Sequence, residues 1–234
     1  MTIGPVLLLG FLLGMRHATD ADHVVAVATV VSRERTLRGA LPIGALWGVG
    51  HTLTILSVGG AIVFFGVVIP PRLGLGMEFS VALMLILLGG MNLRGVLRQS
   101  RSASSAERTL GAAEPNHVHH FGIGARAIRP LFLGVVHGLA GSGAIALLVL
   151  GTIREAHLAL LYLVVFSVGT IAGMLLITLA VAMPFATSAG RFRRVHSTLA
   201  ILTCMASMIF GAVLVRELGF VHGLFSANPH WAPE

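Results

Sequence analysis

Five ionisable side chains lie within eight residues of an otherwise apolar stretch near the start of the chain. They are one arginine, two aspartates and two histidines in the segment 16–23, which reads RHATDADH, and the chain has no other aspartate. An ionisable group at the centre of a membrane helix costs at least about 2.5–3.5 kcal/mol, so this cluster indicates a function. Imidazoles and carboxylates without a thiol favour a borderline first-row divalent cation, whereas Ca²⁺ and Mg²⁺ prefer oxygen ligands.

Helical geometry determines which of these side chains could bind one ion. At 100° per residue, His17, Asp20 and His23 share one face of a helix, whereas Asp22 points away from it. A regular helix would direct Asp22 at another ligand, and local unwinding would let Asp22 and backbone carbonyls join the site. We predict metal ligation by His17, Asp20, Asp22 and His23. The alternative is a buried polar cluster that only holds helices together.

A further histidine, His51, lies in the next apolar stretch between Gly50 and Thr52. Glycine beside it allows another helix to approach closely. We predict His51 as a fifth metal ligand. Its alternatives are orientation of an aspartate and a structural hydrogen bond.

Other polar residues are predicted to line a pathway or to orient the ligands. His137 stands in the glycine-rich stretch 136–144, which suggests a bent or broken helix with exposed carbonyls. The arginine of the motif could pair with either aspartate. The predicted set is Arg16, Thr52, His137 and Ser142. A separate histidine tract, His117, His119 and His120, is either a loose metal-binding segment or a solvated loop.

Composition places these residues in a membrane protein. The 234 residues are 56% hydrophobic and only 11% charged, whereas a soluble protein carries roughly 25% charged residues. The net charge is +7, but all sixteen basic residues are arginines that flank apolar spans, so we expect no nucleic-acid partner. The only cysteine, Cys204, excludes an intramolecular disulfide and a cysteine-based metal site. We expect no resident cofactor, because the ion would be a substrate.

Apolar spans and turn residues predict an all-α, polytopic membrane protein with about six transmembrane helices. The predicted spans are Gly4–Val31, Ala40–Ile69, Met77–Leu97, Ile128–Thr152, Leu158–Pro184 and Ser197–Leu218. We divide the chain into a first three-helix repeat with the metal motif (1–98), a flexible cytoplasmic loop rich in His, Arg and Ser (99–126), a second three-helix repeat (127–220) and a short tail (221–234).

Arginine counts predict how the spans are oriented. Twelve arginines flank the first, third and fifth connections, and three flank the opposite side. Positive charge stays in the cytoplasm, so both termini are predicted outside a cytoplasmic (inner) membrane that the chain crosses several times.

The two halves of the chain resemble each other at a nearly constant offset. Leu13–His17 resembles Leu133–His137 at an offset of 120, and 47–50 resembles 166–169 at 119. Gly90 and Gly211 take equivalent places at 121. With three spans per repeat, the second repeat must be inverted in the membrane, which is typical of secondary transporters.

The motif resembles the signature of the nickel/cobalt transporter family. That signature, His-x-x-x-x-Asp-His, falls on His17, Asp22 and His23, and Gly50-His51-Thr52 resembles the family's second histidine motif. The resemblance implies secondary transport of Ni²⁺ or Co²⁺, with the histidines and the aspartate essential. The second half has His137 and glycines where better-known members carry acidic residues and threonine. Together with the smaller helix number, this resembles the shorter, urease-accessory-type branch, which implies a homo-oligomer or a urease or hydrogenase maturation partner.

We therefore predict a secondary transporter that takes up Ni²⁺ or Co²⁺, and not an enzyme. No Gly-rich loop ending in Gly-Lys-Ser/Thr is present, so ATP hydrolysis by the chain is excluded. The alternatives are efflux of the same ions and a membrane partner that delivers nickel to a metalloenzyme. An intramembrane metalloenzyme is less favoured, because the chain has no His-Glu-x-x-His motif.

Overall fold

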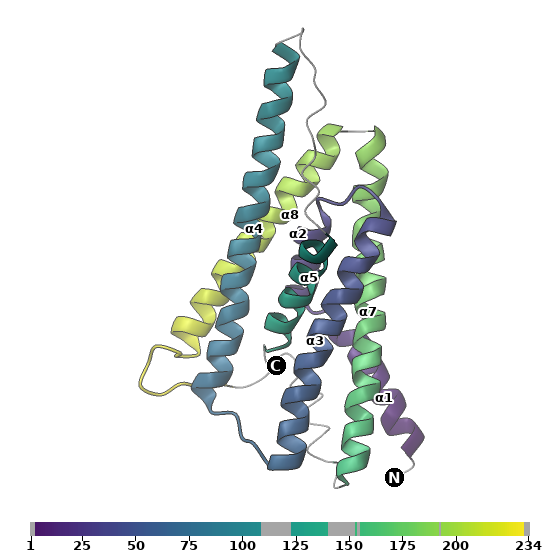
Figure 1. The fold of residues 1–234 in the computed structure, drawn as a ribbon. Helices are drawn as coiled ribbons and strands as arrows, with labels where there is room; N and C mark the ends of the chain where they lie inside the picture. The colour runs from purple at the N-terminus through teal and green to yellow at the C-terminus, as the bar shows by residue number, and fades with distance from the viewer. Residues whose placement is uncertain (1–2, 109–122, 140–152, 154, 192, 232–234) are drawn as a thin grey trace.

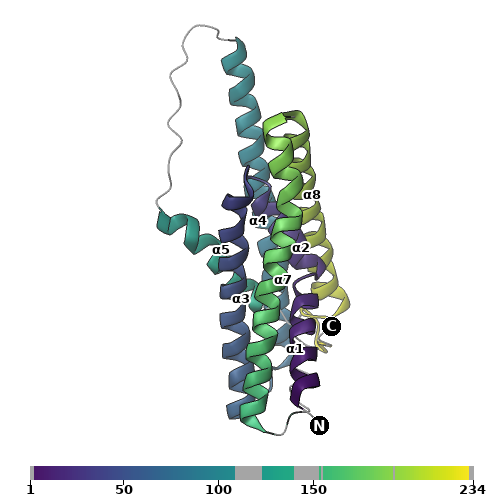
Figure 2. The ribbon, with the colours of Figure 1, turned by 90° about the vertical axis from the view of Figure 1, so that its right-hand side faces the viewer.

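Every regular element of the described residues is a helix. The computed structural model describes residues 3–108, 123–139, 153, 155–191 and 193–231. Its helices run mostly along one long direction (Figures 1 and 2). They are α1 (Ile3–His17), α2 (Ala21–Val31), α3 (Leu37–Phe65), α4 (Pro71–Arg108), α5 (Ile123–Gly138), α7 (Ala156–Arg191), α8 (Arg193–Arg216) and the π-helical turn η2 (Glu217–Val221). The predicted all-α fold is confirmed for this part of the chain.

Four of the described helices are long and apolar enough to cross a membrane, namely α3, α4, α7 and α8. They correspond to the second, third, fifth and sixth predicted spans, and the chain is a multi-pass membrane protein. Of the fourth predicted span, α5 ends at Gly138 and residues 140–152 lie outside the described part. The connection between the third and fourth predicted spans is shorter than the predicted loop 99–126, because α4 continues to Arg108 and α5 begins at Ile123.

The first predicted span is interrupted at the motif and is not one continuous helix over 4–31. α1 ends at His17, and Asp20 takes an extended conformation (φ −58°, ψ 144°) before α2 begins. The amide of Thr19 donates to the Arg16 carbonyl at 2.8 Å, and the carbonyl of Asp20 accepts the first bond of α2 from Val24 at 3.0 Å. The local unwinding considered above is therefore what the structure shows.

Glycines let the helices of the two halves touch backbone to backbone. α7 lies between α1 and α3 (Figures 1 and 2). A Cβ at Gly14 of α1 would overlap the carbonyl oxygen of Phe166 in α7. A Cβ at Gly134 of α5 would likewise overlap the carbonyl oxygen of Trp47 in α3. Gly134 stands 120 positions after Gly14, and Phe166 stands 119 positions after Trp47. The two contacts therefore correspond to each other at the offset found between the two halves of the sequence.

The third helices of the halves, α4 and α8, also pack through glycines. A Cβ at Gly89 would lie 2.7 Å from the Cys204 carbonyl oxygen, and one at Gly211 would lie 2.7 Å from that of Ala82. Gly90, which the sequence comparison matched to Gly211, meets no atom within 4 Å. Gly89 therefore faces α8, and Gly90 does not.

This neighbouring pair gives a matched test of the packing. Gly89→Ala is expected to destabilise the protein by about 1 kcal/mol, because the methyl group crowds a backbone carbonyl that cannot move aside easily. Gly90→Ala is expected to be neutral or to stabilise by a few tenths up to about 1 kcal/mol, since alanine favours the helix and nothing opposes it. Thermal unfolding of the two purified variants in detergent measures the difference, and equal midpoints would contradict this contact.

Side-chain hydrogen bonds fix α2 between α4 and α8. Asn92 of α4 donates to the Thr29 carbonyl at 2.7 Å, and the Thr29 hydroxyl donates to the Thr203 carbonyl of α8 at 3.4 Å. Ser207 of α8 also donates to the Leu85 carbonyl of α4 at 2.9 Å. Beneath them, an apolar core gathers residues of α2, α3, α4 and α7 around Trp47. The second half of the broken span is therefore held rigidly against long helices.

Candidate metal centre

Four buried histidines meet where the first span is interrupted. His17 ends α1, His23 lies in the first turn of α2, His51 lies in the middle of α3 and His137 lies near the end of α5. His17 is 5% exposed and the other three are fully buried. The His23 ring centroid is 4.7 Å from that of His17, 5.0 Å from that of His51 and 4.2 Å from that of His137. Four separate helices thus contribute one imidazole each.

The glycine contacts explain why the rings can come so close. Gly14 precedes His17 by three residues, and Gly134 precedes His137 by three. Each glycine allows its helix to touch a neighbouring backbone, which carries the following histidine into the interior. A Cβ at Gly138 would also lie 2.7 Å from the His51 carbonyl oxygen, so α5 and α3 are in contact beside the rings.

Three of the histidines form one candidate ligand group. The Nε2 atoms of His17 and His51 are 2.9 Å apart. One ligand atom from each of His17, His23 and His51 lies within 4.8 Å of the other two. Since neutral imidazole nitrogen binds divalent first-row metals, this arrangement can hold a single ion such as Ni²⁺ or Co²⁺.

The two aspartates make different contacts. Asp20 is 39% exposed at its side chain, and its Oδ2 lies 2.9 Å from Nδ1 of His17. Asp22 is 16% exposed, and its Oδ1 accepts from both the backbone amide and Nδ1 of His23, at 2.9 and 3.0 Å. Its Oδ2 lies 2.9 Å from Nε2 of His137. Asp22, His23 and His137 make up a second candidate ligand group.

The geometry departs from the face predicted for a regular helix. On a regular helix Asp22 would point away from His17 and His23 and orient another ligand, for which His51 is the nearest candidate in the sequence. In the structure it contacts His23 and His137, because the interruption turns α2 relative to α1. Asp20, which a regular helix would place with the histidines, contacts Nδ1 of His17 through its Oδ2.

The remaining predicted residues lie further from the rings or outside the described part. Arg16 is exposed and makes no ion pair with Asp20 or Asp22 among the described residues, because it follows the outward face of the last turn of α1. The hydroxyl of Thr52 is buried and has no hydrogen-bond partner within the same residues. The structure does not describe Ser142 or the tract of His117, His119 and His120.

Two aromatic residues that the sequence did not single out wall the site. The ring centroid of Trp47 lies 5.5 Å from that of His137, and the ring centroid of Phe166 lies 5.7 Å from that of His17. Trp47 is fully buried and Phe166 is 2% exposed. The four-residue spacing of Trp47 and His51 on one helix is the only sequence signal for this role. Apolar walls of this kind limit access of water to the ligands.

Comparison with known proteins adds one relative. The chain is 34% identical over 220 residues to the urease accessory protein UreH of Bacillus sp. (strain TB-90), an alignment that covers 94% of each chain. No family model matches the chain. No solved structure matches it either.

Proposed function

We propose a transport function from the premise that this chain belongs to the UreH family of urease accessory proteins, the urease-accessory-type membrane branch of the nickel/cobalt transporter superfamily. In this proposal the chain is a secondary transporter that takes up Ni²⁺ or Co²⁺ and is not an enzyme. The observation that carries it is the convergence of four buried imidazoles and Asp22 at a broken helix inside an apolar bundle. Ionisable groups at such a depth mark ion pathways.

The ligand types support the choice of ion. Imidazole nitrogens suit Ni²⁺ and Co²⁺, whereas Mg²⁺ and Ca²⁺ select sites made of oxygen atoms. The membrane potential can drive uptake, because two charges that move inward through 100 mV gain roughly 4.6 kcal/mol. The relative is named a urease accessory protein, which supports a cytoplasmic maturation system that uses the imported nickel. The same name supports the second candidate function, which is direct delivery of nickel to such a partner.

The arrangement of the helices supports the inverted repeat. α1 packs on α7 and α5 packs on α3, so the first helix of each half contacts the second helix of the other. Along the chain, α1, α3 and α4 alternate in direction, and α5, α7 and α8 alternate in the opposite sense (Figure 1). Rocking of one half against the other about the histidines would expose the ion to each side in turn.

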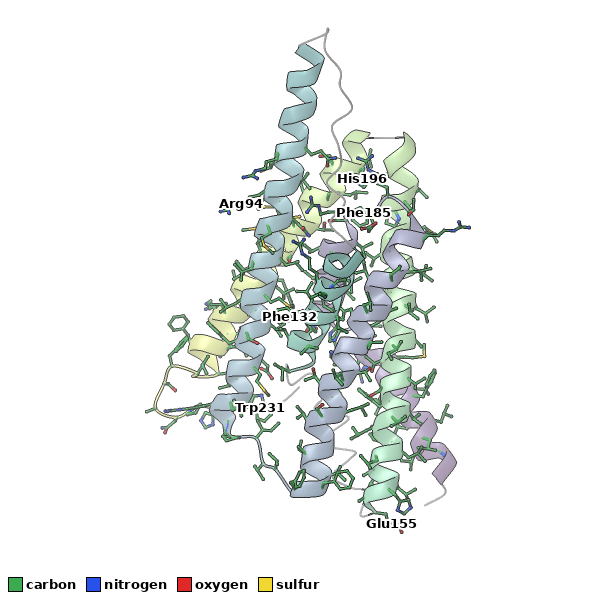
Figure 3. The ribbon with its side chains drawn as sticks, viewed as in Figure 1. Arg94, Phe132, Glu155, Phe185, His196 and Trp231 are labelled. Atoms are coloured by element: carbon green, nitrogen blue, oxygen red, sulfur yellow. The ribbon has the colours of Figure 1, made fainter. Side chains whose placement is uncertain are left out.

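The positions of the connections support the proposed orientation. Figure 3 shows Arg94 and His196 toward one end of the bundle and Glu155 at the other. The α2–α3 connection, with Arg33 and Arg35, lies toward the same end as Arg94. We assign this arginine-rich end to the cytoplasm and both termini to the outside of the inner membrane.

Ion uptake into proteoliposomes tests the function. Wild-type protein is expected to accumulate ⁶³Ni²⁺ when a potential, negative inside, is imposed, and the rate should fall at least roughly 10- to 100-fold in His17→Ala and His51→Ala because each loses a ligand. His157→Ala is the matched control, since that side chain is 76% exposed at the far end of α7. Absence of uptake by the wild type would reject transport and favour the delivery partner.

A further inference from the structure

We infer that the ion is held by nitrogen alone, on His17, His23 and His51, and that Asp20 and Asp22 are positioning residues and not ligands. The inference rests on the proposed function, whose substrate ion it assigns to particular atoms. It follows from which nitrogen of each ring the carboxylates contact.

His17 presents one ring nitrogen to a carboxylate and the other to a second histidine. Its Nδ1 lies 2.9 Å from a carboxylate oxygen of Asp20. An ionised carboxylate only accepts hydrogen bonds, so the proton of the neutral ring resides on Nδ1. The lone pair is then on Nε2, which faces Nε2 of His51 at 2.9 Å. The contact with Asp20 therefore turns the metal-binding nitrogen of His17 inward.

His23 also presents its Nδ1 to a carboxylate. Nδ1 of His23 lies 3.0 Å from Oδ1 of Asp22, which also accepts the His23 backbone amide at 2.9 Å. The proton is thus on Nδ1, and the lone pair is on Nε2. That Nε2 is buried and has no hydrogen-bond partner among the described residues. A buried, unpaired acceptor costs free energy unless something binds it, and a cation would do so.

The third ligand is His51. Its Nε2 is directed at the lone pair of His17, while its Nδ1 is buried without a partner in the described part of the chain. When a cation lies among the three Nε2 atoms, the proton that His51 shared with His17 moves from Nε2 to Nδ1 of the same ring, so that each Nε2 offers a lone pair to the cation. Carboxylates bonded to the outer nitrogen of a metal-binding histidine are a common way to fix its tautomer and raise its basicity.

Asp22 has a second role in this arrangement. Both of its oxygens are engaged, Oδ1 with His23 in the first half of the chain and Oδ2 with His137 in the second half. A bound ion withdraws electron density from the His23 ring, which strengthens the hydrogen bond from His23 to Oδ1 of Asp22. The contact between Oδ2 of Asp22 and His137 then weakens. Asp22 therefore links occupation of the site to the position of α5. The competing arrangement places the ion between Asp22, His23 and His137.

Ligand counting in the purified, detergent-solubilised full chain tests the inference. With Ni²⁺ bound, X-ray absorption of the wild type is expected to show three imidazoles and no carboxylate. Asp22→Asn keeps an oxygen that accepts from Nδ1, so it should retain three imidazoles and bind roughly 10- to 100-fold more weakly, as expected for a positioning residue. Asp22→Ala should bind more weakly still and change the spectrum. His51→Ala should lose one imidazole, and His137→Gln should lose none.

Other outcomes separate this inference from the transport proposal. A carboxylate ligand that disappears in Asp22→Asn, or an imidazole lost in His137→Gln, would overturn the inference and put the ion in the Asp22, His23 and His137 group. Three-imidazole binding without uptake in liposomes would reject transport and leave the inference standing. Thermal unfolding with and without Ni²⁺ verifies that each variant is folded, and His157→Ala should match the wild type in every readout.

Discussion

Replacing His23 by alanine is expected to abolish Ni²⁺ transport and to weaken Ni²⁺ binding by roughly 100-fold or more, beyond the loss seen for partners that only orient ligands. His23 is fully buried and belongs to both candidate ligand groups. Its removal also leaves Asp22 facing His137 without its other partner. Without His23 both candidate ligand groups are incomplete, so the ion has no second complete site through which it could be transported. Uptake of ⁶³Ni²⁺ into proteoliposomes and isothermal titration calorimetry measure the two effects.

The control for this variant is His196→Ala. His196 lies at the arginine-rich end of α8, where its ring meets Phe185 (Figure 3). Its substitution is expected to leave both Ni²⁺ binding and transport within about twofold of the wild type, as for a surface change away from the site. If His23→Ala bound Ni²⁺ with the affinity of the wild type, the ion would be held elsewhere, and the centre described here would be rejected.

Gly134→Ala is expected to destabilise the protein by about 1–3 kcal/mol and also to stop transport. The added methyl group would overlap the Trp47 carbonyl and approach the His51 amide at 3.0 Å, so α5 must move away from α3. That movement separates His137 from Asp22 and opens the wall formed by Trp47. Thermal unfolding in detergent and ⁶³Ni²⁺ uptake report on the two consequences.

Gly60→Ala provides the comparison on the same pair of helices. Gly60 lies in α3, the helix that Gly134 of α5 contacts, but a Cβ at Gly60 meets nothing within 4 Å. Its unfolding midpoint should equal or slightly exceed that of the wild type, and its uptake should be unchanged. If Gly134→Ala unfolded and transported like Gly60→Ala, the close contact between α3 and α5 would not be required.

Much of the architecture could be predicted because it depends on local sequence. Apolar runs bounded by Pro70, Pro71 and arginines predicted the four long helices, and the resemblance of the motif to the urease-accessory-type branch is confirmed by the relative. The histidines His17, His23 and His51 were also chosen from sequence, and the structure brings their rings together. Whether they bind a metal ion stays a prediction.

The interruption of the first span and the partners of Asp22 could not be derived from sequence. Alanine, as at position 18, is the best helix former and threonine, as at position 19, is only mildly unfavourable, so nothing local requires the helix to end there. The break is held by distant contacts, such as Gly173 of α7, whose Cβ would lie 2.7 Å from that of Ala18 and 2.9 Å from the Met15 carbonyl. The contact between Asp22 and His137 depends on the same tertiary packing and joins residues from opposite halves.

The interruption at residues 18–20 has a consequence for how the protein is made. Two short helices with free backbone groups between them are costly in lipid until a neighbour covers them. The covering helix is α7, whose Phe166 meets Gly14. Roughly 150 further residues must be synthesised first, which at about 5–20 residues per second takes roughly 8–30 s. The interrupted segment leaves the ribosome well before α7, and it is therefore expected to stay beside water or the insertion machinery until α7 packs against it.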